Sequence, residues 1–110
     1  MMQFTYFDRR ELEWKNIPGR CYLVNLPIVQ DVPALRDNDL IVHRNVNQNA
    51  PSTKAWTVTH RKTSFAIATG RTRAAAMAHA QAALLAKGND MFLRAIAAAE
   101  LQLASLQAVA

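Results

Sequence analysis

The chain has 110 residues, of which 51% are hydrophobic, and it carries a formal net charge of +5. Its length fits a single α+β domain covering residues 1–110, and its apolar content excludes a wholly disordered chain. No run of about eighteen apolar residues is free of charge, so we expect no membrane span, and the amino terminus lacks the pattern of a signal peptide. The single cysteine, Cys21, excludes an intrachain disulfide framework and predicts a reducing, cytoplasmic environment.

The amino-terminal part of the chain is predicted to contain short strands and one short helix. Residues 2–7 hold three aromatic side chains and read as a strand. The Asp-x-x-Glu spacing that begins at Asp8 matches a capping box, which predicts a short helix ending before Pro18. Residues 20–26 are rich in β-forming side chains and predict a second strand, whereas residues 27–39 are expected to form a surface connection.

The middle of the chain is predicted to form most of a small antiparallel sheet. Residues 40–46 (LIVHRNV) read as a strand, and residues 47–54 are a polar loop. Apolar and polar residues then alternate over 56–60 and again over 65–69, which predicts a hairpin of two half-buried strands joined by residues 61–64. The register that gathers the apolar side chains on one face pairs Val58 with Ile67, which places His60 opposite Phe65.

The carboxyl-terminal part is predicted to form two helices. Thr72 is a suitable N-cap for the first helix, which would end near Lys87 and be followed by Gly88. Asn89 or Asp90 would cap the second helix. Both are rich in alanine, the residue with the highest helix propensity. The expected fold is therefore a small, mostly antiparallel β-sheet packed against two C-terminal antiparallel α-helices, with a short N-terminal helix. The apolar stripe expected on the first helix is Ala74, Met77, Ala78, Leu84 and Leu85.

The last helix carries two apolar strips, which predict a homodimer because one neighbouring surface cannot cover both. The alternative is that an alanine-rich helix simply looks apolar all round. The heptad-like seam predicted to mediate oligomerisation consists of Phe92, Ile96, Ala99, Leu103 and Leu106. The second strip consists of Leu93, Ala97, Leu101, Ala104 and Ala108.

Positive charge is concentrated in one half of the chain. Residues 40–89 hold seven basic residues and no acidic residue, so they carry +7 while the rest of the chain carries −2. Such a segment attracts polyanions, which predicts a non-enzymatic nucleic-acid-binding protein. The alternative is a phage- or plasmid-type adaptor or inhibitor, which would use the same basic surface against an acidic protein or the apolar C-terminal helix against a protein partner. The basic surface could also simply be solvated. The candidate anion-binding residues are Arg44, Lys54, Arg61, Lys62, Arg71 and Arg73.

The predicted topology divides these basic residues between two ends of the hairpin. Antiparallel pairing brings the start of the first strand beside the end of the second, so Lys54, Arg71 and Arg73 should converge, with Arg44 nearby. A helix N-terminus there also favours anions. Arg61 and Lys62, in the hairpin turn, should lie at the opposite end of the strands, about 20 Å from this group at roughly 3.3 Å per residue.

Residues 40–87 resemble the C-terminal half of double-stranded-RNA-binding domains. The likeness rests on three strands followed by Gly70-Arg71-Thr72-Arg73 and by a helical pattern containing Ala76, Ala80, Leu84 and Leu85. It implies that the loop 47–54 and the helix start at residues 71–73 contact a duplex. The helix that precedes the strands in those domains is missing, since residues 20–38 read as strand and loop. The match is to a supersecondary pattern, and we assign no family from it.

The side chains that carry catalysis or bind metals are sparse in this chain. No Cys-x-x-Cys or His-x-x-x-His pair occurs, so no metal site is expected, and three glycines in all do not provide a phosphate-binding loop; no cofactor is expected. Cys21 lies in an apolar strand and is expected to be an inert thiol. One catalytic alternative is a metal-free ribonuclease in which His43 and His60 on adjacent strands act as acid and base.

Overall fold

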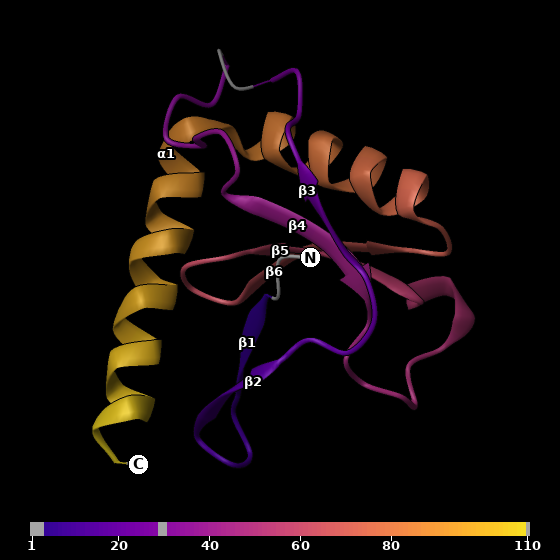
Figure 1. Cartoon of the computed structure of the whole chain (residues 1–110). Coiled ribbons are helices and arrows are strands. Elements are labelled where there is room, and N and C mark those ends of the chain that lie inside the picture. Colours follow the sequence, from indigo (N-terminus) through magenta and orange to yellow (C-terminus); the bar gives the residue numbers. More distant parts are fainter. Residues whose placement is uncertain (1–3, 29–30, 110) are drawn as a thin grey trace.

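The computed structural model describes residues 4–28 and 31–109, which form six strands in two sheets and one long C-terminal helix (Figure 1). The α+β class is confirmed, whereas the two antiparallel C-terminal helices and the short N-terminal helix are wrong. The elements are β1 (Thr5–Asp8), β2 (Glu13–Asn16), β3 (Cys21–Val24), β4 (Leu40–Arg44), the 3-10 turn η1 (Ser52–Lys54), β5 (Trp56–His60), β6 (Phe65–Gly70) and α1 (Arg73–Ala108).

The residues expected to form an N-terminal helix instead form the turn of a hairpin between β1 and β2. The Asp8 side chain accepts hydrogen bonds from the backbone N–H groups of Arg10 and Glu11, at 2.8 and 3.1 Å. Leu12 then adopts a left-handed conformation, with φ of 56°, and donates its N–H to the Asp8 carbonyl. Lys15 on β2 pairs with the Asp8 carboxylate at 2.9 Å and is the main reason why the pKa of Asp8 falls to about 2. Asp8 therefore makes the hydrogen bonds expected of a capping residue, but they stabilise a hairpin turn and not the start of a helix.

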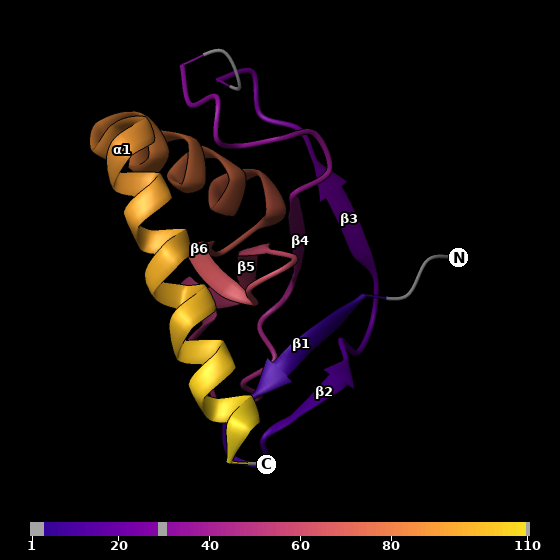
Figure 2. The same cartoon turned by 90° about the vertical axis from the view of Figure 1, so that its left-hand side faces the viewer.

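The main sheet has the strand order β3-β4-β5-β6, with every neighbouring pair antiparallel. The first arm of α1, residues 73–87, covers one face of this sheet, and the hairpin of β1 and β2 lies toward the other face (Figures 1 and 2). The core beneath the helix contains Val24, Leu26, Ile28, Val32, Leu35, Leu40, Val42, Val58, Ala76, Ala80, Leu84 and Phe92. A smaller cluster beneath the hairpin contains Phe4, Ile17 and Ile41.

The pairing of β5 with β6 agrees with the predicted register at one end only. His60 lies opposite Phe65, as predicted, but Val58 lies opposite Ala68 instead of Ile67. A bulge after Val58 inserts one extra residue into β6, because Thr59 lies opposite Ala66. The sequence pattern gives the period of each strand but does not reveal an inserted residue.

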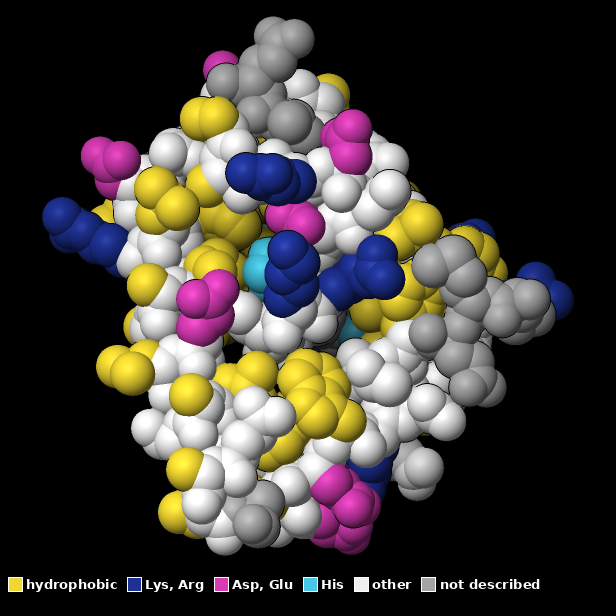
Figure 3. Space-filling view, turned by 60° about the vertical axis from the view of Figure 1, so that its left-hand side comes forward, with side chains coloured by type: hydrophobic (Ala, Val, Ile, Leu, Met, Phe, Trp, Pro, Cys, Tyr) yellow, Lys and Arg dark blue, Asp and Glu magenta, His cyan; other side chains and the backbone are white. Residues whose placement is uncertain are grey.

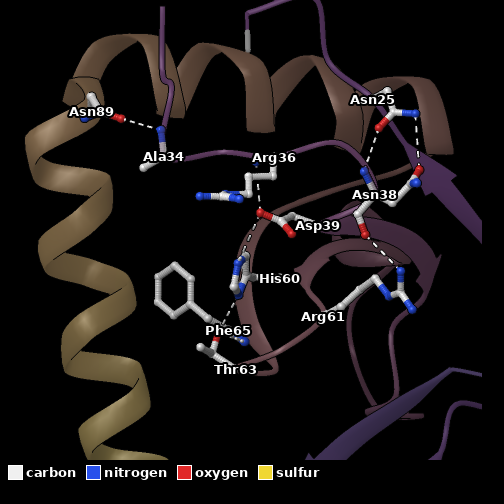
Figure 4. Close-up of polar contacts among 10 residues, drawn as sticks. All are labelled: Asn25, Ala34, Arg36, Asn38, Asp39, His60, Arg61, Thr63, Phe65 and Asn89. Atoms are coloured by element: carbon white, nitrogen blue, oxygen red, sulfur yellow. Dashed lines mark hydrogen bonds and ion pairs between the residues drawn. The ribbon is translucent and has the colours of Figure 1, made fainter. Parts of the chain in front are cut away.

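The connection between β3 and β4 was predicted as a surface segment, and this is wrong for its apolar residues. Ile28, Val32 and Leu35 are buried in the core beneath the helix, and Val32 is fully inaccessible to solvent. The backbone N–H of Ala34 donates to the Asn89 side chain at 2.8 Å, which ties this segment to α1 (Figure 4).

The helix α1 is one element with a sharp bend at Gly88, where φ is 75° and ψ is 176°. This backbone conformation is accessible almost only to glycine. The second arm, residues 89–108, leaves the first at a wide angle and runs past the sheet toward the hairpin of β1 and β2 (Figure 2). The bend, instead of a loop and an antiparallel return, explains why the predicted helix pair is wrong. The predicted stripe on the first arm is right for Leu84, which is buried, and for Met77, which packs against the core. It is wrong for its other three members, which are exposed, because Ala76 and Ala80 are buried in their place.

The second arm turns its heptad-like seam toward its own chain. Phe92 and Ala99 are buried, and Phe92 and Ile96 pack with the main core. The second strip is exposed: Leu93 is 51% and Leu101 is 72% accessible. Figure 3 shows hydrophobic side chains dispersed over this side of the molecule. Within the described ranges, no helix is long and apolar enough to cross a bilayer.

Candidate functional site

Two arginines and two aromatic side chains meet at one end of the main sheet. Arg44, the last residue of β4, pairs with Trp56, the first residue of β5, and its Cζ lies 4.8 Å from the indole centroid. The Cζ of Arg73, at the start of α1, lies 5.8 Å from the same indole and 4.1 Å from the ring centroid of Tyr22. Tyr22, Arg44, Trp56 and Arg73 are called the arginine–aromatic cluster below.

The local sequence fixes the position of Arg73 within this cluster. Gly70 ends β6 opposite Trp56, and its missing side chain lets the first turn of α1 approach the strand. The Thr72 side chain accepts a hydrogen bond from the N–H of Ala75 at 3.1 Å, as expected of an N-cap. The predicted helix start at Thr72 is therefore confirmed, and it places Arg73 directly above the end of the sheet.

The arginine–aromatic cluster holds two positive charges around one indole without an acidic partner. Both arginines are exposed, and among the described residues no carboxylate forms an ion pair with Arg44 or Arg73. Two guanidinium groups on one ring repel each other, and an anion bound between them would offset this repulsion. The aromatic faces hold the arginine side chains in place, so less conformational entropy is lost when an anion binds.

Two more of the predicted basic residues belong to the same end of the molecule. Lys54 ends η1, two residues before Trp56, and η1 packs against β6. Arg71 lies between the end of β6 and the start of α1, and both side chains are exposed. The structure thus brings four of the six predicted anion-binding residues to one end of the sheet.

The structure places the other two basic residues at the opposite end of the hairpin. Arg61 donates from Nη1 to the carbonyl of Asn38 at 2.9 Å (Figure 4), and its Cζ lies 4.8 Å from the ring centroid of Phe4. A cavity of about 500 Å³ beside Arg61 and Lys62 is also lined by acidic side chains. Arg61 therefore holds two segments of the fold together, and its surroundings are of mixed charge.

The two histidines considered as a catalytic pair lie on opposite faces of the main sheet. His60 faces α1, where its ring contacts Phe92 edge-on with centroids 6.0 Å apart. His43 faces the other side, where it lines a groove, and only 3% of its surface is accessible. A sheet lies between the two imidazoles, so they cannot act on one substrate as acid and base.

Each histidine is held by its neighbours in a defined role. His43 donates from Nδ1 to the Arg44 carbonyl at 2.7 Å, so its Nε2 accepts from the Thr59 hydroxyl at 2.8 Å. His60 Nδ1 lies 2.9 Å from the Thr63 hydroxyl, and its Nε2 is 3.9 Å from Asp39 (Figure 4). Burial lowers the pKa of both histidines, and the Asp39 carboxylate only partly opposes this at His60. Both imidazoles are structural neutral groups at pH 7.

The residue types that bind metals are dispersed. Among residues 4–28 and 31–109, no three side chains of the His, Cys, Asp or Glu type gather in a group that could hold a metal ion. Cys21 is half-buried beside the smaller core cluster, and burial raises the pKa of its thiol. The thiol therefore stays protonated near neutral pH, which makes it a poor nucleophile.

The aromatic members of the cluster were not identified as site residues from the sequence. Trp56 and Tyr22 read there as ordinary strand residues, and both also pack against the main core. Their positions in the strands could have identified them. Tyr22 lies on β3 and Trp56 on β5, the two neighbours of the strand that ends with Arg44, and both side chains are on the face that α1 covers.

Scans against protein families, curated proteins and solved structures found no match for this chain. The resemblance to double-stranded-RNA-binding domains is limited to the order of β4, β5, β6 and the first arm of α1. The segment before them holds β3 and an irregular connection where those domains have a helix.

Proposed function

We propose that this chain is a small, non-enzymatic, cytoplasmic protein that binds nucleic acid through the phosphate backbone. The residues that would contact phosphate are Arg44, Lys54, Arg71 and Arg73. The observation that carries the proposal is the pair of guanidinium groups around Trp56, at 4.8 and 5.8 Å, with no carboxylate paired to either among the described residues.

A nucleic acid fits this arrangement better than an acidic protein. The guanidinium group offers planar donors that match phosphate oxygens, and the accessible parts of aromatic rings add stacking surface for bases. The whole segment 40–89 lacks acidic residues, so the field is positive well beyond the cluster. An adaptor or inhibitor that binds an acidic protein remains the second candidate, and it relies on the same surface.

The proposal is tested by fluorescence anisotropy with a labelled 20-nucleotide probe, used as a single strand and as a duplex. Affinity should fall steeply between 50 and 200 mM salt, with a log–log slope of roughly −3 to −4 on duplex DNA if about four phosphates are contacted. The double variant Arg44→Gln/Arg73→Gln should reduce the steepness by about two units.

The matched control is Lys87→Gln/Arg94→Gln, which removes the same charge from exposed positions elsewhere on α1. It should change the slope little. Equal effects of the two double variants would show that only net charge matters. If no probe binds at 50 mM salt, the nucleic-acid proposal is wrong and the adaptor becomes the better account.

The homodimer also remains a proposal, and different residues now support it. The heptad-like seam predicted to form the dimer faces the chain's own core, whereas the second strip is exposed. We therefore propose that a second copy packs against Leu93, Ala97 and Leu101. Small residues between the leucines would allow two helices to approach closely.

A further inference from the structure

A groove of about 710 Å³, lined by both polar and apolar side chains, lies on the face of the main sheet that the helix does not cover. Its floor is formed by β4, β5 and β6, and its walls by β1, the turn after β1 and the loop after β4. A volume of this size is within the range of small-molecule sites. None of the basic residues of the arginine–aromatic cluster lines it, so it is a separate feature.

The groove combines hydroxyl, amide and aromatic groups with the charged side chains of Asp8, Arg9 and Arg10. Thr57 and Thr69 line the floor beside His43, whose ring nitrogens are already engaged by its neighbours. Tyr6 and Phe65 add half-buried aromatic rings. Stacking surfaces together with neutral donors and acceptors are the means by which proteins recognise unpaired nucleobases. The amides that line the groove come from Asn45, Asn47, Gln48 and Asn49.

The loop that supplies these amides is stabilised by side-chain hydrogen bonds of its own. The Asn45 side chain donates to the Lys54 carbonyl at 2.9 Å and accepts from the N–H of Asn47 at 2.9 Å. Asn47 in turn accepts from the N–H of Asn49 at 3.0 Å. This wall of the groove is thus preorganised. The hydrogen bond from Asn45 to the Lys54 carbonyl also connects the wall to the basic end of the sheet.

The groove and the arginine–aromatic cluster share one end of the sheet. Arg44 of the cluster is followed directly by Asn45 of the groove, and Thr69 of the groove is two residues from Arg71. The cluster faces α1, whereas the groove opens on the other face. A chain of nucleotides whose phosphates lie along the basic end could therefore turn over the end of the sheet and place a base in the groove.

We propose that the groove binds one unpaired nucleobase of a single-stranded nucleic acid. This inference rests on the proposed function, because the arginine–aromatic cluster holds the backbone while the groove holds the base. A base within a duplex is stacked and paired, and it cannot enter the groove without being extruded. The protein consequently prefers single strands to duplexes of the same sequence. Arg9 and Arg10 on the rim would carry the phosphate next to the bound base.

The test compares three proteins on a single-stranded probe and on its duplex, by anisotropy at 100 mM salt. The wild type should bind the single strand more tightly. The variant Thr57→Val/Thr69→Val removes two groove hydroxyls with little change in shape, and it should lose about tenfold in single-strand affinity while duplex affinity stays within twofold. The control Thr5→Val/Ser105→Ala removes two exposed hydroxyls outside the groove and should match the wild type.

A second measurement does not depend on the stability of any variant. Titration of the wild type with adenosine monophosphate, followed by NMR, should shift the backbone amides of Asn47, Thr57 and Thr69. Equal affinity for both probes, together with unshifted groove amides, would overturn the groove proposal and leave backbone binding intact. Failure of both probes to bind would overturn the proposed function as well.

Discussion

Gly70, the last residue of β6, lies directly against the backbone of Ala76 in the first turn of α1. A Cβ atom on Gly70 would lie 2.5 Å from the Ala76 nitrogen and 2.9 Å from its Cα. Both distances are far shorter than ordinary contacts, and the neighbours are backbone atoms that cannot rotate away. This contact sets how closely the helix approaches the sheet, and with it the position of Arg73 above Tyr22.

The variant Gly70→Ala should therefore be destabilised and should bind oligonucleotides more weakly. The first turn of α1 has to move, which costs about 1–3 kcal/mol of unfolding free energy, as in other overpacked cores. Urea denaturation measures the stability, and anisotropy measures the affinity. Unchanged stability would mean that the helix start shifts freely, and Arg73 would then not be held by this contact.

The bend at Gly88 gives a prediction with a definite sign. Alanine favours helix over glycine by about 1 kcal/mol, so Gly88→Ala would stabilise a straight helix. At φ of 75° and ψ of 176° an alanine is strained, and we expect a loss of about 1–3 kcal/mol in urea denaturation. The control Ala82→Gly, at an exposed helical position, should cost only its propensity. An increase in stability for Gly88→Ala would contradict the bend.

The buried histidines predict how stability depends on pH. Burial lowers the pKa of His43 and His60 in the folded protein below their ordinary value of 6.5. The unfolded chain then binds more protons, so their contribution to stability is complete above pH 6.5 and is lost as the pH falls below it. Urea denaturation at pH 7.5 and 5.5 should show this loss, and His43→Gln should reduce it. A stability that rises on acidification over this range would contradict the burial of both rings.

The proposed homodimer is tested with a pair of double variants on the second arm of α1. Leu93→Asp/Leu101→Asp places charge on the exposed strip and should give a folded monomer in light scattering. Leu103→Asp/Leu106→Asp, on the half-buried seam, should lower the stability of the chain itself. A wild type that is monomeric at about 100 μM would refute the dimer. Its dissociation constant would then lie well above ~100 μM, which is too weak for a specific interface.

The strands of the main sheet could be predicted from the sequence because their signals are local. Alternation identified β5 and β6, and the Thr72 cap identified the start of α1. The convergence of Lys54, Arg71 and Arg73 followed from antiparallel pairing alone, since adjacent strand ends share one edge of the sheet.

The features that could not be predicted depend on contacts between distant residues. The turn signal at Asp8 is the same for a helix and a hairpin, and the hairpin depends on the pairing of β1 with β2, which also brings Lys15 to the Asp8 carboxylate. Alanines occur on every face of α1, so the sequence pattern could not show which face is buried. The pairing of Tyr22 with Arg73 joins residues fifty-one positions apart, and no local pattern announces it.

The central claim is that the anion binds beside Trp56, and tryptophan fluorescence tests it most directly. The chain has two tryptophans, so Trp14→Phe leaves Trp56 as the only reporter. Titration with a single-stranded oligonucleotide at 50 mM salt should change the Trp56 emission, saturate at the affinity given by anisotropy, and reverse at high salt. An oligonucleotide that binds by anisotropy while the Trp56 emission stays constant throughout would place the site elsewhere and contradict the account.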